Sequence, residues 1–354
     1  MDLARRLFAR ANEFYVPAAE RGILQVQMVG SPELDHHFVL DTTLEMKPGV
    51  TEAADAHVAL SRTMLDFVLA NPTTFEPRAT PYSRSIRTSG NTRLVNHFAQ
   101  FLKRPDARTA ALVERMDQET FPAPRVADYE GGVEQARILH HLSRNEPLHV
   151  RDAIPAARDD WSAQRVRERF GPLPLRRNGA TGEIQTVGSF VDAFNDPLAA
   201  RIYSDGCEVP APMLELLSHG WFDRRDFVAT RLWFGRRRQD KVITRLHRDF
   251  QVSFLTHLFG DKRVRLYPPN RARNLQAYPT FNTYQICAFN PTIPECIPGM
   301  DQIPFVDVEL RAGDTLVIPA CWFHCVWAET DVLSISQFMT LETVERLSTS
   351  LAQR

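Results

Sequence analysis

The chain has 354 residues, of which 44% are hydrophobic and 24% charged, a composition typical of a globular protein with one large domain or two ordinary ones. The 42 Lys and Arg residues nearly balance the 43 Asp and Glu residues, so charge gives no reason to expect a nucleic acid or a membrane surface as partner. No apolar run approaches the roughly 18 residues of a membrane span. The five cysteines are odd in number and form no CxxC pair, which fits reduced thiols, and we expect a cytoplasmic protein.

The first hundred residues predict a small sheet covered by helices. Apolar residues at helical spacing indicate a helix within residues 1–14. Apolar and polar residues alternate over 37–46, which is typical of a half-buried strand. Further strands are expected over 22–30 and 57–61, and further helices over 61–71 and 91–102.

This order of elements resembles the sterol-carrier-protein (type 2) fold, in which helices and a meander of strands enclose an apolar tunnel. The stretch SIRTSGNTRLVNHFAQF, residues 85–101, would stand for the late strand and final helix of that fold. The resemblance covers about residues 5–105 and implies an α+β domain over 1–107. Two roles are open for it: its tunnel could hold an acyl or lipid ligand, or the domain could serve only for docking or dimerisation.

The second half of the chain has a different organisation. Residues 108–132 contain an amphipathic helix and then a stretch with Pro and Gly, which predicts a helical connector. From 133 to 354, short apolar strands are separated by Gly and Pro, the pattern of a β-sandwich or barrel. We therefore expect an α+β domain followed by a mainly-β domain.

One strand of the second half could contribute to a metal site. Residues i and i+2 of a strand face the same side, so His247 and Asp249 in TRLHRDFQVSF project into the same space. His324 follows a turn and a strand in AGDTLVIPACWFH and is a third candidate. Two histidines and one carboxylate form the ligand set of non-haem Fe(II) oxygenases and leave three metal positions open. A lone HxD pair is weak evidence by itself, because single buried histidines are usually only hydrogen-bonded.

The stretches TRLHRDFQVSFLTHLFGDKRVRLYPP (244–269) and AGDTLVIPACWFHCVW (312–327) resemble the JmjC-type, cupin-like 2-oxoglutarate oxygenases, in particular their asparaginyl-hydroxylase branch. The shared pattern is T-x-x-H-x-D, then a G-x-K-R strand that ends in P-P, then G-D-x-L-x-I-P-x-x-W-x-H. With EPLHVRDAI (146–154), the resemblance covers about residues 125–345. It implies a double-stranded β-helix, the cupin jelly roll, over 133–354, with Fe(II), 2-oxoglutarate and dioxygen bound.

The resemblance assigns the iron to His247, Asp249 and His324, which would be the catalytic residues. Lys262 would pair with the far carboxylate of 2-oxoglutarate, and Thr244 would donate a hydrogen bond to it. Such a dianion needs a cation and a hydroxyl where it is buried, which supports both assignments.

Four further positions follow from the same resemblance. Tyr203 is expected to reach the co-substrate as well. Ser253 and Gln337 stand where the family often has asparagine, and we expect polar contacts from both to 2-oxoglutarate. Arg248 stands where the family often has an aromatic residue, and we expect it to line the substrate mouth.

Three functions are open. The first is a dioxygenase that hydroxylates an unactivated C–H bond of an amino-acid, peptide or carrier-bound small-molecule substrate. The second is a lipid- or acyl-binding protein with a non-catalytic cupin sensor domain, and the third is a cupin that uses iron without 2-oxoglutarate. The intact His-Asp-His set argues against the second, and Lys262 argues against the third. Neither a nucleic acid nor a membrane is expected as a partner, and the sequence identifies neither the substrate nor the oligomeric state.

Overall fold

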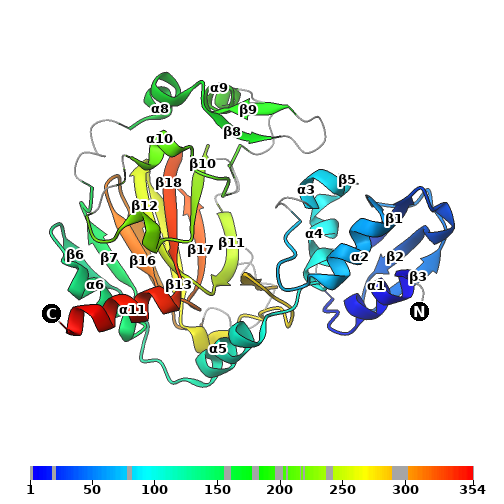
Figure 1. Ribbon diagram of the computed structural model, residues 1–354, viewed down its shortest axis with the longest axis horizontal. Coiled ribbons are helices and arrows are strands. Elements are labelled where there is room, and N and C mark those ends of the chain that lie inside the picture. The colour runs from blue at the N-terminus through cyan, green and yellow to red at the C-terminus, as the bar shows by residue number, and fades with distance from the viewer. Residues whose placement is uncertain are drawn as a thin grey trace. The chain divides into compact units, whose positions relative to one another are not determined.

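The structure is a computed structural model that describes most of the chain. The described residues are 3–17, 21–77, 82–154, 161–177, 183–195, 202–204, 206–215, 217, 220–236, 242–288 and 302–353. They form two units: the first runs to Glu114 and also includes Gln276–Ala288, and the second takes the other described residues. Figure 1 labels the helices and strands of both units.

A mixed sheet lies at the centre of the first unit. Its strands, in spatial order, are β3 (Leu44–Pro48), β2 (His36–Leu40), β1 (Gly22–Val29), β4 (Ala56–Ser61) and β5 (Arg87–Gly90). All neighbours are antiparallel except β1 and β4, which run parallel. The unit also contains α1 (Leu3–Asn12), η1 (Pro32–Leu34), α2 (Arg62–Ala70), α3 (Tyr82–Ser85), α4 (Thr92–Gln100) and β14 (Tyr284–Ile286). Apolar residues of the sheet and of α1, α2 and α4 share one core.

The elements expected in this unit from the spacing of apolar residues are found, with one difference. The strand expected over 37–46 is a hairpin of β2 and β3, joined by a turn in which the Asp41 amide donates to the Thr43 carbonyl oxygen (3.1 Å). Leu40 pairs with Leu44, so the two strands fold back symmetrically and the apolar alternation continues across the turn. The unit is α+β as expected, and its likeness to the sterol-carrier fold stays a prediction.

The first unit is completed by Gln276–Ala288, which comes from far along the chain. The Tyr278 ring is buried in the core of this unit, and its hydroxyl lies 3.0 Å from His97 Nδ1. Lys103, which is wholly buried, donates a hydrogen bond to the Tyr284 hydroxyl (3.0 Å). The segment therefore supplies both apolar packing and partners for buried polar groups of the first unit.

Two sheets form the second unit. One contains, in spatial order, β10 (Ala229–Gly235), β18 (Val332–Met339), β12 (Val252–Phe259), β16 (Thr315–Ile318), β7 (Leu148–Arg151) and β6 (Ala127–Glu130). The other contains β11 (Val242–Asp249), β17 (Phe323–Ala328), β13 (Lys262–Tyr267) and β15 (Val306–Leu310). Below, the first of these is the six-stranded sheet and the second is the β11–β17 sheet.

The chain passes repeatedly from one of these sheets to the other: β11, β12 and β13 alternate between them, and so do β15, β16, β17 and β18. One core cluster contains side chains from both sheets, among them Leu255 and Leu316 of one and Val264 and Val326 of the other. This alternation of antiparallel strands around a shared interior is the double-stranded β-helix of cupins. The mainly-β fold expected for the C-terminal half is confirmed.

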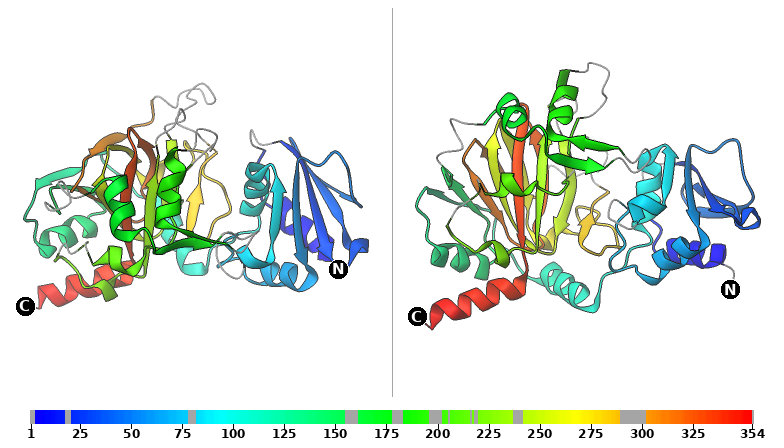
Figure 2. Two further views of the ribbon diagram at one scale, coloured as in Figure 1. Left: turned by 90° about the horizontal axis from the view of Figure 1, so that it is seen from above. Right: turned by 45° about the horizontal axis from the view of Figure 1, so that its top comes forward.

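Helices cover the outer face of the six-stranded sheet, as the two views in Figure 2 show. The helical elements of the second unit are α6 (Gln135–Ser143), α8 (Ala163–Phe170), α9 (Val187–Asp192), η2 (Ala193–Asn195), α10 (Ala211–Leu214), η3 (Arg224–Asp226), η4 (Pro269–Arg271) and α11 (Leu341–Ala352). A short hairpin of β8 (Pro174–Arg177) and β9 (Ile184–Thr186) accompanies them. Residues of α6 and α11 pack on Val252, Phe254 and Val317.

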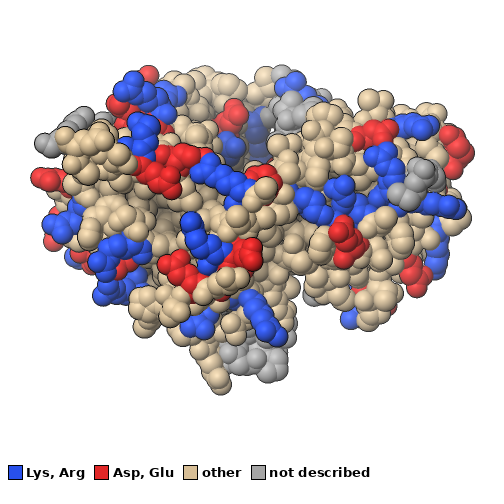
Figure 3. All heavy atoms as spheres, turned by 60° about the horizontal axis from the view of Figure 1, so that its bottom comes forward, with Lys and Arg blue, Asp and Glu red and all other residues tan. Residues whose placement is uncertain are grey.

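The segment expected as a connector, 108–132, carries most of α5 (Ala107–Gln118) and all of β6. β6 pairs in parallel with β7, so the end of this segment belongs to the six-stranded sheet. Among the described residues, no helix is both long enough and apolar enough to cross a membrane. On the face drawn in Figure 3, basic and acidic side chains are interspersed, in keeping with the balanced composition.

Candidate metal centre

Strands β11 and β17 bring the three expected ligands together. His247 of β11 pairs directly opposite His324 of β17, and their ring centroids are 4.2 Å apart. Asp249 Oδ2 lies 3.8 Å from His247 Nε2 and 3.7 Å from His324 Nε2. One ligand atom from each residue lies within 4.8 Å of the other two, a spacing that a single metal ion could bridge. This is the only such group of three or more ligand-type residues in the described part of the chain.

Backbone carbonyl groups orient both imidazole rings. His247 Nδ1 lies 2.8 Å from the Arg245 carbonyl oxygen, and His324 Nδ1 lies 3.2 Å from that of Trp322. A carbonyl oxygen only accepts hydrogen bonds, so each Nδ1 carries the proton. Each Nε2 then presents its lone pair on the side of Asp249, which is the tautomer that metal-ligating histidines use.

Burial also prepares these groups for a cation. It lowers the pKa of His324 well below the usual range, and the neighbouring His247 lowers it further, so the ring is neutral. Burial raises the pKa of the Asp249 carboxyl, and the nearby His247 opposes that shift. A carboxylate removed from water is unfavourable unless a cation or hydrogen-bond donors surround it. A divalent ion bound to the two Nε2 atoms would compensate the charge of Asp249.

An irregularity in β11 places Thr244 on the same side as the ligands. Thr244 pairs with Val326 and His247 with His324, so three steps on β11 match two steps on β17. Val326 and His324 are two residues apart and share a face of the strand. Thr244 therefore shares the face of His247, whereas in a regular strand a residue three positions away would point to the opposite side.

A buried lysine lies on the same inner face. Lys262 begins β13 opposite Ala328, and Leu266, four residues on, pairs with His324. Residues at even spacing share a face, so Lys262 points into the interior that holds the candidate ligands. Its side chain is buried, with 2% of the residue exposed.

Lys262 takes part in a buried hydrogen-bond network. Its Nζ donates to Ser334 Oγ (2.8 Å), which also lies 2.7 Å from His257 Nδ1. His257 Nε2 lies 2.8 Å from the Gly260 carbonyl oxygen and must donate to it, so Nδ1 accepts from the Ser334 hydroxyl. Burial lowers the pKa of Lys262 to about 7. Burial first, and then the charge of Lys262, lower the pKa of His257 to about 3, so this ring is neutral.

No carboxylate pairs with Lys262 among the residues that the structure describes. An ammonium group that is removed from water without a counter-ion is costly, and this is why its pKa falls. An anionic ligand would supply the missing charge. Tyr203 packs in the same region, against Ala328 and Val332, and its ring stacks on Trp233 with centroids 6.3 Å apart.

Ser253 and Gln337, the two positions where the family often has asparagine, lie on opposite faces of the six-stranded sheet. Ser253 is two and four residues from Leu255 and His257 on β12 and shares their inner face. Gln337 pairs opposite Phe254 on β18, and Phe254 belongs to the outer core under α6 and α11. The expected contact between Gln337 and 2-oxoglutarate is therefore wrong, because the strand alternates and the inner position falls on Ser336.

Arg248 does not line the substrate mouth either. It alternates with His247 and Asp249 and so points away from them, and its wholly buried side chain donates to Asp117 of α5. The prediction is corrected: the residue between two ligands on a strand must face the other side.

Sequence reasoning did not select Ser334, Ser336, His257 or Trp233, all of which lie on the inner face. Trp233 Nε1 donates to Ser336 Oγ (2.9 Å), next to the network of Lys262. A usable signal existed in VLSISQFM, where two serines two residues apart interrupt an apolar strand. Polar residues at that spacing on a central strand indicate a face that meets a polar ligand or network.

Comparison with known proteins agrees with this geometry. Residues 185–340 match the cupin-like domain family. Over 207 residues, 56% of the chain, the sequence is 26% identical to Jumonji C domain-containing protein 5 of Drosophila melanogaster, 48% of which is covered. It is 33% identical over 107 residues to lysine-specific demethylase JMJ30 of Arabidopsis thaliana, and 32% identical over 92 residues to tRNA wybutosine-synthesizing protein 4 of Aspergillus oryzae. These matches cover 29% and 25% of the chain, and 24% and 8% of the relatives.

The chain thus spans about half or less of the length of these curated relatives. Residues 185–340 of the second unit are thus similar to the cupin-like domain family, and Jumonji C domain-containing protein 5 is a relative at modest identity.

Proposed function

We propose that the second unit is a non-haem iron dioxygenase that uses 2-oxoglutarate to hydroxylate an unactivated C–H bond. The observation that carries this proposal is the pairing of two sites on one inner face: a His-Asp-His group with both Nε2 atoms on the side of Asp249, and a buried lysine that has no carboxylate partner among the described residues. The first can bind a metal, and the second can bind an anion. The match to JmjC-type proteins supports the same reading.

The donor set fits Fe(II). Two neutral imidazole nitrogens and one carboxylate are the ligands of non-haem Fe(II) oxygenases, whereas a structural zinc site has four protein ligands. His247, Asp249 and His324 would hold the metal through one side and leave the other side open. The bound metal, with 2-oxoglutarate and dioxygen, would supply the oxidising chemistry that converts C–H to C–OH while 2-oxoglutarate becomes succinate and carbon dioxide.

The inner face also fits 2-oxoglutarate. This co-substrate is a dianion, and its second carboxylate requires a cation and hydroxyl groups away from water. Lys262 and Ser334 would bind that carboxylate, with Thr244 directed to the same interior by the bulges in β11. Tyr203 and Trp233 pack beside Ala328 and Val332 and would shield the bound carboxylate from water. Lys262 disfavours an iron cupin that works without 2-oxoglutarate, because such an enzyme has no use for this cation.

The relatives carry names that refer to lysine demethylation and to tRNA modification, so they do not agree on one substrate. We propose an amino-acid, peptide or carrier-bound small-molecule substrate, in keeping with the balanced charge of the chain. An acyl or lipid ligand for the first unit, with a non-catalytic second unit, remains the alternative proposal, and the complete ligand set weighs against it.

The proposal is tested by loading the full chain anaerobically with Fe(II), adding 2-oxoglutarate and air, and measuring succinate against a library of amino acids and peptides. Wild type should release succinate, and His324→Ala should lose bound iron and succinate release together. His140→Ala, an exposed histidine on α6, is the matched control and should behave as wild type. Full iron occupancy in His324→Ala would show that the ligand assignment is wrong.

A further inference from the structure

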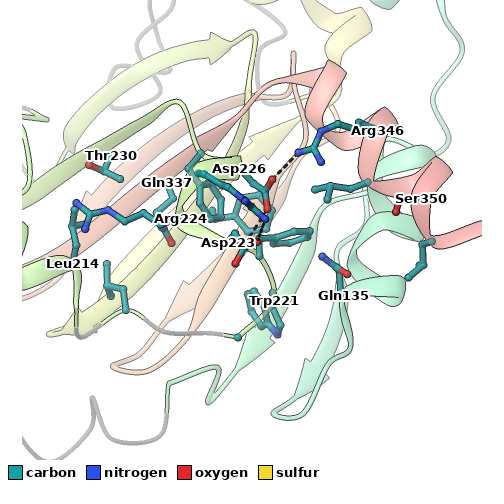
Figure 4. Close-up of a pocket in the computed structure, with 18 of the residues that line it drawn as sticks. Gln135, Leu214, Trp221, Asp223, Arg224, Asp226, Thr230, Gln337, Arg346 and Ser350 are labelled. Carbon is teal, nitrogen blue, oxygen red and sulfur yellow. Dashed lines mark hydrogen bonds and ion pairs between the residues drawn. The ribbon is translucent and has the colours of Figure 1, made fainter. Parts of the chain in front are cut away.

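A cavity of about 750 Å³ lies on the outer face of the six-stranded sheet, away from the candidate metal centre. Figure 4 shows it bordered by residues of β10, β18, η3 and α11. Phe254 and Gln337 pair across β12 and β18 and both project to this side. The volume is within the range of small-molecule sites in proteins, roughly 300–1,000 Å³.

The cavity is lined by a buried polar side chain, that of Gln337. The residue is 7% exposed, and its side-chain oxygen has no hydrogen-bond partner among the described residues. Buried amide groups in native proteins are almost always hydrogen-bonded, so an unpaired one that lines a cavity points to a missing partner. In Figure 4, Gln337 stands with Thr230 and Arg224 along the same wall. A ligand with an N–H group could donate to the free oxygen.

Of the six charged residues that line the cavity, Arg224 and Glu215 have no ion-pair partner in the described part of the chain. Arg346 pairs with Asp226 (2.6 Å), and Arg225 pairs with Asp223 (3.1 Å). The Arg224 side chain is exposed and makes no ion pair or hydrogen bond within the described ranges. The rim therefore offers a guanidinium group to an anion, and a carboxylate matches its paired donors.

The floor of the cavity is aromatic. Phe222 and Phe227 each meet Phe254 edge-on, with ring centroids 5.4 Å apart in both pairs. Trp221 also lines the cavity. Aromatic walls of this kind favour a planar ring, which can add an edge-to-face contact.

We propose that this cavity is a second ligand site, which binds a small aromatic carboxylate carrying an amide N–H. Its ring contacts the aromatic floor, its N–H donates to Gln337, and its carboxylate pairs with Arg224. An N-acylated aromatic amino acid, or the C-terminal aromatic residue of a peptide, has this combination of groups. The proposal does not depend on the metal or on 2-oxoglutarate, because none of its residues lies on the inner face.

The test titrates the full chain, without added metal, with N-acetylphenylalanine and follows binding by ligand-observed NMR. We expect saturable binding that Gln337→Leu weakens by about tenfold, the effect of losing one buried hydrogen bond, and that Arg224→Gln weakens by about twofold to fivefold, the effect of losing one exposed ion pair. Arg137→Gln, an exposed arginine of α6 outside the cavity, is the matched control and should leave binding unchanged.

Two altered probes assign the contacts. Phenylpropionate lacks the amide, so Gln337→Leu should no longer affect its binding. N-acetylphenylalanine amide lacks the carboxylate, so Arg224→Gln should no longer affect its binding. Absence of binding at millimolar probe, or equal binding by wild type and both variants, would overturn the proposal. Displacement of the probe by 2-oxoglutarate in the presence of Mn(II) would overturn it too, because the probe would then occupy the inner face. Arg224 is exposed, so its variant keeps the test valid if Gln337→Leu fails to fold.

Discussion

Arg248 and Asp117 form a two-pronged ion pair, with Nη1–Oδ1 and Nη2–Oδ2 distances of 2.6 and 3.3 Å. The guanidinium is wholly buried, and its carbon atom lies 4.6 Å from the centroid of the Phe323 ring. Arg248 stands between His247 and Asp249, and Phe323 precedes His324. The pair thus joins α5 to the outer side of both strands that carry the candidate ligands.

Asp117→Ala should destabilise the second unit, because it leaves a buried guanidinium without its counter-ion. Removing one partner of a buried ion pair costs roughly 3–5 kcal/mol, and we expect about 2 kcal/mol since the Asp117 carboxylate is partly exposed. Denaturant unfolding measures this loss. Glu114→Ala, at an exposed site on the same helix, serves as control and should change little. Equal stabilities of the two variants would show that the ion pair contributes nothing.

Lys262→Met should separate co-substrate binding from metal binding. The variant removes the cation but keeps a buried apolar side chain of similar length, so the barrel should stay folded with its metal affinity near wild type. We expect the KM for 2-oxoglutarate to rise roughly 100-fold, as when one partner of a buried charge pair is removed. Steady-state succinate release and metal analysis measure the two effects. An unchanged KM would favour an iron cupin that does not use 2-oxoglutarate.

Lys262 should also make the stability of the protein depend on pH. Its folded pKa is lowered to about 7, below the ordinary value of 10.5, so between these values the unfolded chain binds more protons than the folded chain. Because of this group, the free energy of unfolding should therefore increase as pH rises from about 7 to 10.5, by up to about 1.4 kcal/mol per pH unit. Denaturant unfolding of wild type and Lys262→Met across this range measures the difference. Parallel pH curves for the two proteins would contradict it.

Cleavage of the exposed stretch between α5 and β6 should not separate the two fragments under native conditions. The first unit takes Gln276–Ala288 into its core, so the N-terminal fragment should hold the C-terminal fragment through that segment. Mild proteolysis followed by size-exclusion chromatography should give one peak, which denaturant resolves into two fragments. Tyr278→Ala should weaken this association, because removing a buried aromatic side chain costs roughly 3–5 kcal/mol. Immediate separation of the wild-type fragments would contradict the prediction.

The candidate ligands could be predicted from the sequence because strand geometry is local. The period of two along a strand was enough to predict that His247 and Asp249 share a face. The turn and strand that precede His324 were enough to predict its position. The same period of two explains the error at Gln337. The assignment was displaced by one residue from Ser336, and a shift of one residue along a strand moves the side chain to the opposite face. The bulges that bring Thr244 to the inner face depend on pairing with β17, which no local pattern records.

Contacts between residues far apart in the sequence could not be predicted either. The partners of Arg248 and Tyr278 lie 131 and 181 residues away in sequence. Nothing near either residue indicates those partners, so the sequence suggested a substrate-facing arginine and gave no role to Gln276–Ala288. The α+β and mainly-β characters of the two halves follow from apolar spacing alone and were predicted.

The late segment in the first unit also sets an order for protein synthesis. A ribosome releases the residues up to Glu114 first, yet Tyr278 and Tyr284 emerge only after the whole stretch from Arg115 to Leu275 has been made. At about 5–20 residues per second, the nascent first unit waits roughly 10–30 s for these side chains. During that time His97 and Lys103 lack the hydroxyl partners that they have in the finished protein. The part of the chain that is translated first is therefore not the first to reach its native state.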